Sequence, residues 1–134
     1  MKPQLNHTIV EAHDQRASAE FLAELLGLAQ PMRFGGFLVV EAGNGVSLDF
    51  MSVDADHMIA PQHYAFLVTE AEFDEIFGRI GNRDLRYWAD PDLVRLGEIN
   101  THDGGRGVYF QDPTGHLLEI ITRPYGTGPA STNG

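Results

Sequence analysis

The sequence contains no cysteine, which excludes both a disulfide framework and thiolate ligation of zinc. Lysine is nearly absent, since Lys2 is the only one, and the formal net charge at pH 7 is −10. Nucleic-acid binding depends on clustered Lys and Arg, so we expect no nucleic-acid partner. No apolar run is long enough to cross a membrane, and the first residues contain no apolar signal-peptide core. We therefore expect a cytoplasmic protein without a membrane partner.

The residues that are present suit one folded domain. The chain has 134 residues, of which 43% are hydrophobic and 10% aromatic, and this is enough to bury a core. We predict a single domain over residues 1–125, with module one at 4–53 and module two at 61–124. Residues 126–134 are mostly Gly, Thr, Pro, Ser and Asn, a composition that predicts a flexible tail.

The first half of the chain predicts a strand, a helix and then two or three strands. A strand is expected at Leu5–Glu11, and apolar residues at helical spacing follow between an N-cap at Asp14 and a terminating glycine at Gly27. Residues 32–42 are rich in Phe, Leu and Val but contain two adjacent glycines, so they predict two short strands or one bent strand. A glycine-rich turn then leads into a strand at 46–52, which is typical of a hairpin.

The second half repeats this order. Its expected elements are a strand at 63–68, a helix at 70–80, a short strand at 85–88, a polar loop at 89–106, and a hairpin of strands 107–110 and 117–122. Internal duplication on this scale is a strong architectural signal. The sequence therefore favours two tandem βαβββ modules.

Imidazole and carboxylate groups interrupt apolar strands at matching positions in the two halves. His7 and His63 lie near the start of a strand, and Asp49 and Glu119 each follow a glycine by four residues. Such groups are costly to bury without a partner, and a divalent metal would supply one. His7, His63 and Glu119 would form the facial triad typical of Fe(II). With Asp49 added, the set also suits Zn, Ni, Co or Mn.

Other polar and aromatic residues have less specific interpretations. Three histidines beside turns or strand ends are interpreted as surface residues: His13, His57 and His116. Four larger side chains could line a cleft, although a packing or surface role explains each at least as well: Trp88, Arg106, Arg123 and Tyr125. No residue is assigned to binding an organic cofactor.

Four segments of the chain resemble the vicinal oxygen chelate superfamily of glyoxalases, bleomycin-resistance proteins and extradiol dioxygenases. They are 5–7, 19–28, 63–66 and the Asp-Pro turn with its following strand, 112–120. The resemblance implies an α+β fold of two tandem βαβββ modules that form a cupped, half-barrel mixed sheet around a metal cleft. It also implies that His7, His63 and Glu119 bind the metal. A homodimer is implied as well, and the metal site could lie within one chain or be shared between two.

Residues 100–119 are similar in spacing to a segment of extradiol dioxygenases. That similarity implies catalytic roles for His102, which could move protons, and for Tyr109, whose hydroxyl could orient the substrate. The favoured function is an extradiol-type dioxygenase that uses Fe(II) on a small molecule with vicinal oxygens. One alternative is a glyoxalase-I-like isomerase or lyase with Zn or Ni, in which the carboxylate pair Asp49 and Glu119 matters most. Another is a non-catalytic small-molecule binding protein.

Overall fold

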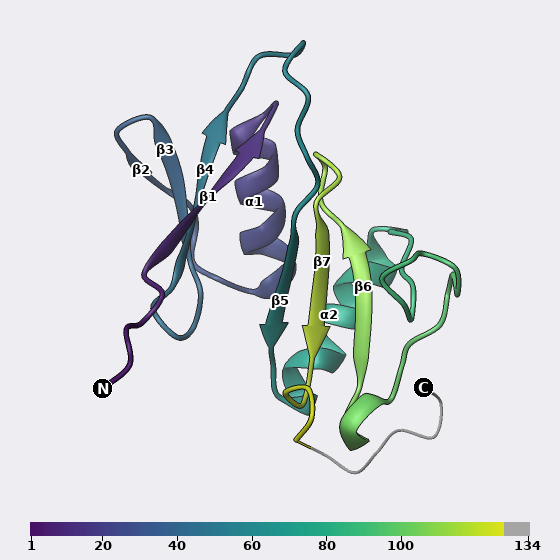
Figure 1. Cartoon of the computed structure of the whole chain (residues 1–134). Coiled ribbons are helices and arrows are strands. Elements are labelled where there is room, and N and C mark those ends of the chain that lie inside the picture. Colours follow the sequence, from purple (N-terminus) through teal and green to yellow (C-terminus); the bar gives the residue numbers. More distant parts are fainter. Residues whose placement is uncertain (128–134) are drawn as a thin grey trace. The chain divides into compact units, whose positions relative to one another are not determined.

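The computed structural model describes residues 1–127, and the chain divides into two compact units that meet in sequence after Ala60 (Figure 1). Each unit combines one mixed sheet with one α-helix, which confirms the predicted α+β class. Most of the predicted tail, residues 128–134, lies outside the described residues. Among the residues described, no helix is long and apolar enough to cross a membrane.

The first unit is a four-stranded sheet with one helix. Its elements are β1 (His7–Ala12), α1 (Gln15–Leu26), β2 (Met32–Phe34), β3 (Phe37–Glu41) and β4 (Ser47–Ser52). The strand order is β1-β4-β3-β2, with β1 parallel to β4 and the other pairs antiparallel. The glycine-interrupted segment therefore forms two short strands, one of the two outcomes expected from the sequence.

Helix α1 begins and ends where the sequence predicts. The Asp14 side chain accepts a hydrogen bond from the N–H of Ala17, and Gly27 ends the helix in the left-handed region at φ 71°. Buried residues of α1, such as Leu22 and Leu25, form a core with alternate residues of the strands, such as Phe50. The alternation turns the remaining side chains of the strands, both polar and apolar, to the other face of the sheet.

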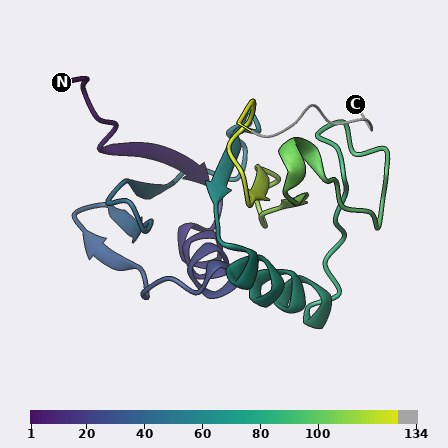
Figure 2. The ribbon, with the colours of Figure 1, turned by 90° about the horizontal axis from the view of Figure 1, so that it is seen from below.

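The second unit has three strands, one α-helix and a short 3₁₀ turn. Its elements are β5 (His63–Leu67), α2 (Glu70–Asn82), η1 (His102–Gly104), β6 (Gly107–Gln111) and β7 (Leu117–Ile121). The strand order is β5-β7-β6, so β7 is central, parallel to β5 and antiparallel to β6. Helix α2 lies along one face of this sheet (Figure 2).

The predicted strand at Leu85–Trp88 is wrong, because only Trp88 forms bridges, to Leu96 and Tyr109. The N–H and the carbonyl of Trp88 both bond to Tyr109, at 2.9 and 2.8 Å. The chain then turns away at Asp90, whose carboxylate accepts hydrogen bonds from the N–H groups of the following loop. Pairing is therefore limited to a single residue, and module two has one strand fewer than predicted.

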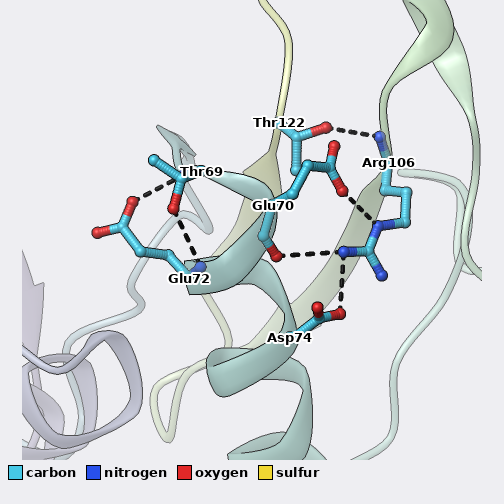
Figure 3. A network of polar contacts seen from close by, with 6 residues as sticks. All are labelled: Thr69, Glu70, Glu72, Asp74, Arg106 and Thr122. Atoms are coloured by element: carbon cyan, nitrogen blue, oxygen red, sulfur yellow. Dashed lines mark hydrogen bonds and ion pairs between the residues drawn. The ribbon is translucent and has the colours of Figure 1, made fainter.

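Arg106 joins the start of α2 to the end of the β6–β7 hairpin (Figure 3). Its guanidinium donates to Glu70 Oε1 at 2.8 Å and to Asp74 Oδ1 at 2.9 Å, and it lies 4.3 Å from the centre of the Phe73 ring. Its backbone N–H donates to Thr122 Oγ1. These contacts give Arg106 a structural role on the helix side of the unit.

The Asp-Pro turn between β6 and β7 is built around Asp112. Its Oδ1 atom accepts hydrogen bonds from the N–H groups of Thr114, Gly115 and His116, all between 2.8 and 3.0 Å. The His116 side chain is only 1% exposed, and its Nδ1 atom accepts a hydrogen bond from the N–H of Gln62. The surface position predicted for His116 is therefore wrong, because its ring ties the turn to the residue before β5.

Candidate functional site

One face of the second sheet gathers a carboxylate, an imidazole and a phenol. Strand β7 is central, and the residues opposite Glu119 are Ala65 on β5 and Tyr109 on β6. His63 lies two residues before Ala65 and so faces the same side. Glu119 is 0% exposed, which places an ionisable group inside the unit rather than at its rim.

His63 and Glu119 form a close pair. The Nε2 atom of His63 lies 2.9 Å from Glu119 Oε1, and the His63 side chain is 45% exposed whereas that of Glu119 is buried. Two ligands at right angles on one ion, each with a bond of about 2.1 Å, are about 3.0 Å apart. In this structure the two atoms form a hydrogen bond, and their separation is also compatible with two neighbouring ligands of one metal ion. The donor types fit a divalent transition metal.

The other oxygen of Glu119 is held by a pair of tyrosines. The Tyr125 hydroxyl donates to Oε2, and the Tyr109 hydroxyl lies 3.0 Å from the Tyr125 hydroxyl. Burial raises the pKa of Tyr109, and the neighbouring Tyr125 hydroxyl and Glu119 carboxylate raise it further. The pKa of Tyr125 is also raised, first by burial and then by the hydrogen bond to Glu119. Both phenols therefore stay protonated near neutral pH.

His7 and Asp49 lie on the face of the first sheet that is turned away from α1. His7 is exposed and its Nδ1 atom is 2.7 Å from Asn6 Oδ1, while Asp49 Oδ1 accepts a hydrogen bond from the Ser47 hydroxyl at 2.9 Å. The register pairs Ile9 with Asp49, which brings the two polar side chains to neighbouring positions of adjacent strands.

This face forms a groove of about 610 Å³, a volume within the range of small-molecule sites. One part of its lining is polar, with Asn6, His7, Ser47 and Asp49, and the rest is largely apolar, with Ile9, Met32, Phe34, Phe37 and Val39.

The structure brings His63, Glu119 and Tyr109 together in the second unit, and it places His7 and Asp49 in the first. Within residues 1–127, no three His, Asp or Glu side chains form a metal-binding group. His102 lies in η1, where its backbone is hydrogen-bonded to Asn100 and Gly105. Among the residues described, its imidazole forms no hydrogen bond with Glu119, His63 or Tyr109.

The sequence analysis named Tyr125 only as a side chain that could line a cleft, and it did not predict the contact with Glu119. Tyr125 follows Glu119 by six residues, beyond the end of β7, and a turn at Pro124 brings its hydroxyl back to the carboxylate. Strand periodicity cannot predict a contact that is made after the strand has ended. The signal available was a tyrosine close in sequence to a buried carboxylate.

Comparison with known proteins agrees with this architecture. The family model described as Glyoxalase/Bleomycin resistance protein/Dioxygenase superfamily matches residues 4–120. The solved structure of the oxidase ChaP-H1 is 63% identical with a TM-score of 0.89, and the match covers 93% of this chain and 99% of that one. The oxidase ChaP-H2 is 61% identical with a TM-score of 0.91, covering 96% and 100% of the two chains. Among curated proteins, the glutathione transferase FosA of Serratia marcescens is 29% identical over 126 residues, covering 90% of this chain and 81% of FosA.

Proposed function

The chain belongs to the Glyoxalase/Bleomycin resistance protein/Dioxygenase superfamily, and we propose that it is a metal-dependent oxidase of that superfamily. The proposed reaction is an extradiol-type dioxygenation with Fe(II), in which the substrate is a small molecule with vicinal oxygens. The two oxidases that are 63% and 61% identical over nearly their whole lengths support oxidation rather than isomerisation. The type of chemistry is thus proposed from the two similar oxidases. The ligands His63 and Glu119 are proposed from their contact in the second unit, and His7 from the resemblance to the superfamily.

The observation that carries the proposal is the His63–Glu119 pair. The Glu119 carboxylate lies on a central strand and is 0% exposed, so it needs a partner. The His63 Nε2 atom is 2.9 Å away, a distance that also suits two ligands of one ion. We assign His7 as the third ligand, contributed by the first unit of the same chain or of a second copy. Bound to this triad, Fe(II) would supply open coordination positions and one-electron chemistry.

The remaining roles follow from the environment of each side chain. Tyr109 is buried beside Glu119, and its hydroxyl oxygen can accept a hydrogen bond from a substrate hydroxyl near the ligands. His102 remains our proposed proton carrier, because a partly exposed imidazole is the side chain most often used as a general acid or base. The groove that His7 lines in the first unit has an apolar wall, which suits the carbon skeleton of a small molecule.

A second candidate function is suggested by Asp49. It lies on the groove face of the strand beside His7, where a carboxylate could abstract a proton from a substrate carbon. A glyoxalase-I-like isomerase or lyase with Zn or Ni would use this group. A protein that only binds its ligand would use the groove without turnover.

The test is oxygen consumption by metal-loaded protein. Protein loaded anaerobically with Fe(II) is mixed with a panel of catechols, and we expect oxygen uptake in proportion to bound Fe(II). Uptake should be lost in Glu119→Gln and His7→Ala and retained in Glu98→Gln, which removes an exposed loop charge. If no catechol causes uptake, the ring-cleavage proposal is overturned. Turnover of a hemithioacetal by the Ni- or Zn-loaded protein would then support the alternative.

A further inference from the structure

We propose that Tyr125 is a positioning residue that makes Glu119 present a single oxygen to the metal. The inference rests on the proposed function, since it concerns how the assigned ligand binds. It goes beyond that function because Tyr125 lies outside the triad and outside the strands that build it. The segment after β7 therefore becomes part of the metal site.

The two oxygens of Glu119 have different partners. Oε1 lies 2.9 Å from His63 Nε2, the spacing of two ligands on one ion, whereas Oε2 accepts the hydroxyl proton of Tyr125. A carboxylate that binds an ion through both oxygens must turn both toward it. The bond from Tyr125 opposes that rotation and leaves Oε1 as the metal-binding atom.

The hydrogen bonds also fix the order of donors in the cluster. A phenol has one proton, and the proton of Tyr125 is donated to Glu119. The contact of 3.0 Å between the two hydroxyls must then use the proton of Tyr109, with the Tyr125 oxygen as acceptor. Tyr109 thus holds the Tyr125 hydroxyl in place, and its own oxygen remains free to accept a hydrogen bond from a substrate hydroxyl.

Polar contacts, rather than burial, hold Tyr125 in position. Its side chain is among the exposed large ones, at 57%, so core packing alone cannot fix the ring. The following residue, Gly126, donates its N–H to Asp103 Oδ1 in η1 at 3.1 Å. The loop that contains η1 thereby anchors the segment whose Tyr125 positions the Glu119 carboxylate.

The experiment compares metal binding by Tyr125→Phe, Tyr109→Phe and the wild-type protein, with Co(II) as the probe. Tyr87→Phe is the matched control. It removes a phenol hydroxyl from a side chain that packs against Phe77 of α2 and belongs to no part of the His63–Glu119 cluster. Co(II) affinity is measured by competition with a chromophoric chelator, coordination by the visible spectrum, and folding by thermal unfolding of the metal-free protein.

For Tyr125→Phe we expect Co(II) affinity to fall by about 10- to 100-fold, the usual effect of removing a partner of a ligand. Its visible bands should weaken as the freed oxygen joins the coordination sphere. Tyr109→Phe keeps the Tyr125 hydroxyl and removes only the group that holds it, so this variant should lose less affinity. Tyr87→Phe should match the wild type.

The outcomes separate the two proposals. If wild-type protein binds Co(II) and Tyr125→Phe binds it with the same affinity and spectrum, the positioning role is overturned and the metal site stands. If wild-type protein and Glu119→Gln are equally unable to bind Co(II), both proposals are overturned. Should Tyr125→Phe fail to fold, an unchanged spectrum and affinity in folded Tyr109→Phe would count against the hydrogen-bonded chain.

Discussion

His63 reaches Glu119 diagonally across two parallel strands, with Nε2 and Oε1 2.9 Å apart. Ala65, not His63, is directly opposite Glu119 in the register. Diagonal neighbours are within reach of longer side chains, and the small Ala65 leaves space for the imidazole to lean along the strand. The His63 side chain is thus 45% exposed while the Glu119 carboxylate beside it is fully buried. An ion from solvent could therefore reach the pair on the histidine side.

Replacing His63 should affect both metal binding and stability. We expect His63→Ala to lower Co(II) affinity by more than about 100-fold, a larger loss than usually follows removal of a partner of a ligand. Its thermal midpoint without metal should also fall, because Oε1 of the buried Glu119 loses its partner at 2.9 Å. The control is His57→Ala, which removes a histidine that is 3.1 Å from Glu11 but belongs to no assigned ligand set. Equal loss of affinity in both variants would contradict the assignment.

Mixing two inactive variants should reveal whether the site is shared between chains. His7→Ala and Glu119→Gln each disable every site in a homodimer. If His7 of one chain serves His63 and Glu119 of the other, half of the randomly mixed dimers regain one intact site of two, or about a quarter of wild-type activity. A site within one chain predicts no recovery. The measurement is oxygen uptake after co-refolding equal amounts of the two variants.

Gly107 is required by the close approach of a buried side chain. A Cβ atom at this position would lie 2.8 Å from Asn100 Oδ1, and Asn100 is held in place by its bond to the Ala89 carbonyl at 2.9 Å. We expect Gly107→Ala to lower the free energy of unfolding by about 1–3 kcal/mol through overpacking. Gly78→Ala is the control, because its Cβ meets nothing within 4 Å and it lies in α2. It should stabilise by up to about 1 kcal/mol, and urea unfolding measures both.

The contact between Glu70 and Arg106 should make stability depend on acidity. Hydrogen bonds from Thr122 and then from Arg106 hold the pKa of Glu70 below its ordinary value. A lowered pKa in the folded state stabilises the protein above the ordinary value of 4.5, and the contribution is lost as the pH falls through the lower folded value. Glu70→Gln should therefore have a lower thermal midpoint than wild type at pH 7, with the difference shrinking in acid.

The control for this prediction is Glu98→Gln, which removes the same charge from an exposed loop position. The thermal midpoint of Glu98→Gln should differ from that of the wild type by the same small amount at pH 7 and in acid. A difference between Glu70→Gln and wild type that is constant with pH would contradict the assigned role of the carboxylate.

Local signals in the sequence were sufficient for the helices and most strands. Asp14 and Gly27 bound α1 as predicted because capping depends only on neighbouring residues. The strand predicted at Leu85–Trp88 was wrong, because the chain turns away at Asp90 and Trp88 alone forms bridges. His116 failed for a related reason, since its burial depends on the N–H of Gln62, which is 54 residues away.

The sequence by itself determined the class of fold, the duplication and the polar residues placed in apolar strands, because period and capping are properties of nearby residues. It also placed His63, Glu119 and Tyr109 on faces of strands. Only the tertiary structure decided that these faces coincide, because the order β5-β7-β6 sets which strands are neighbours. The tertiary structure alone also brought Tyr125 to Glu119, because that contact depends on how the chain turns after the strand ends.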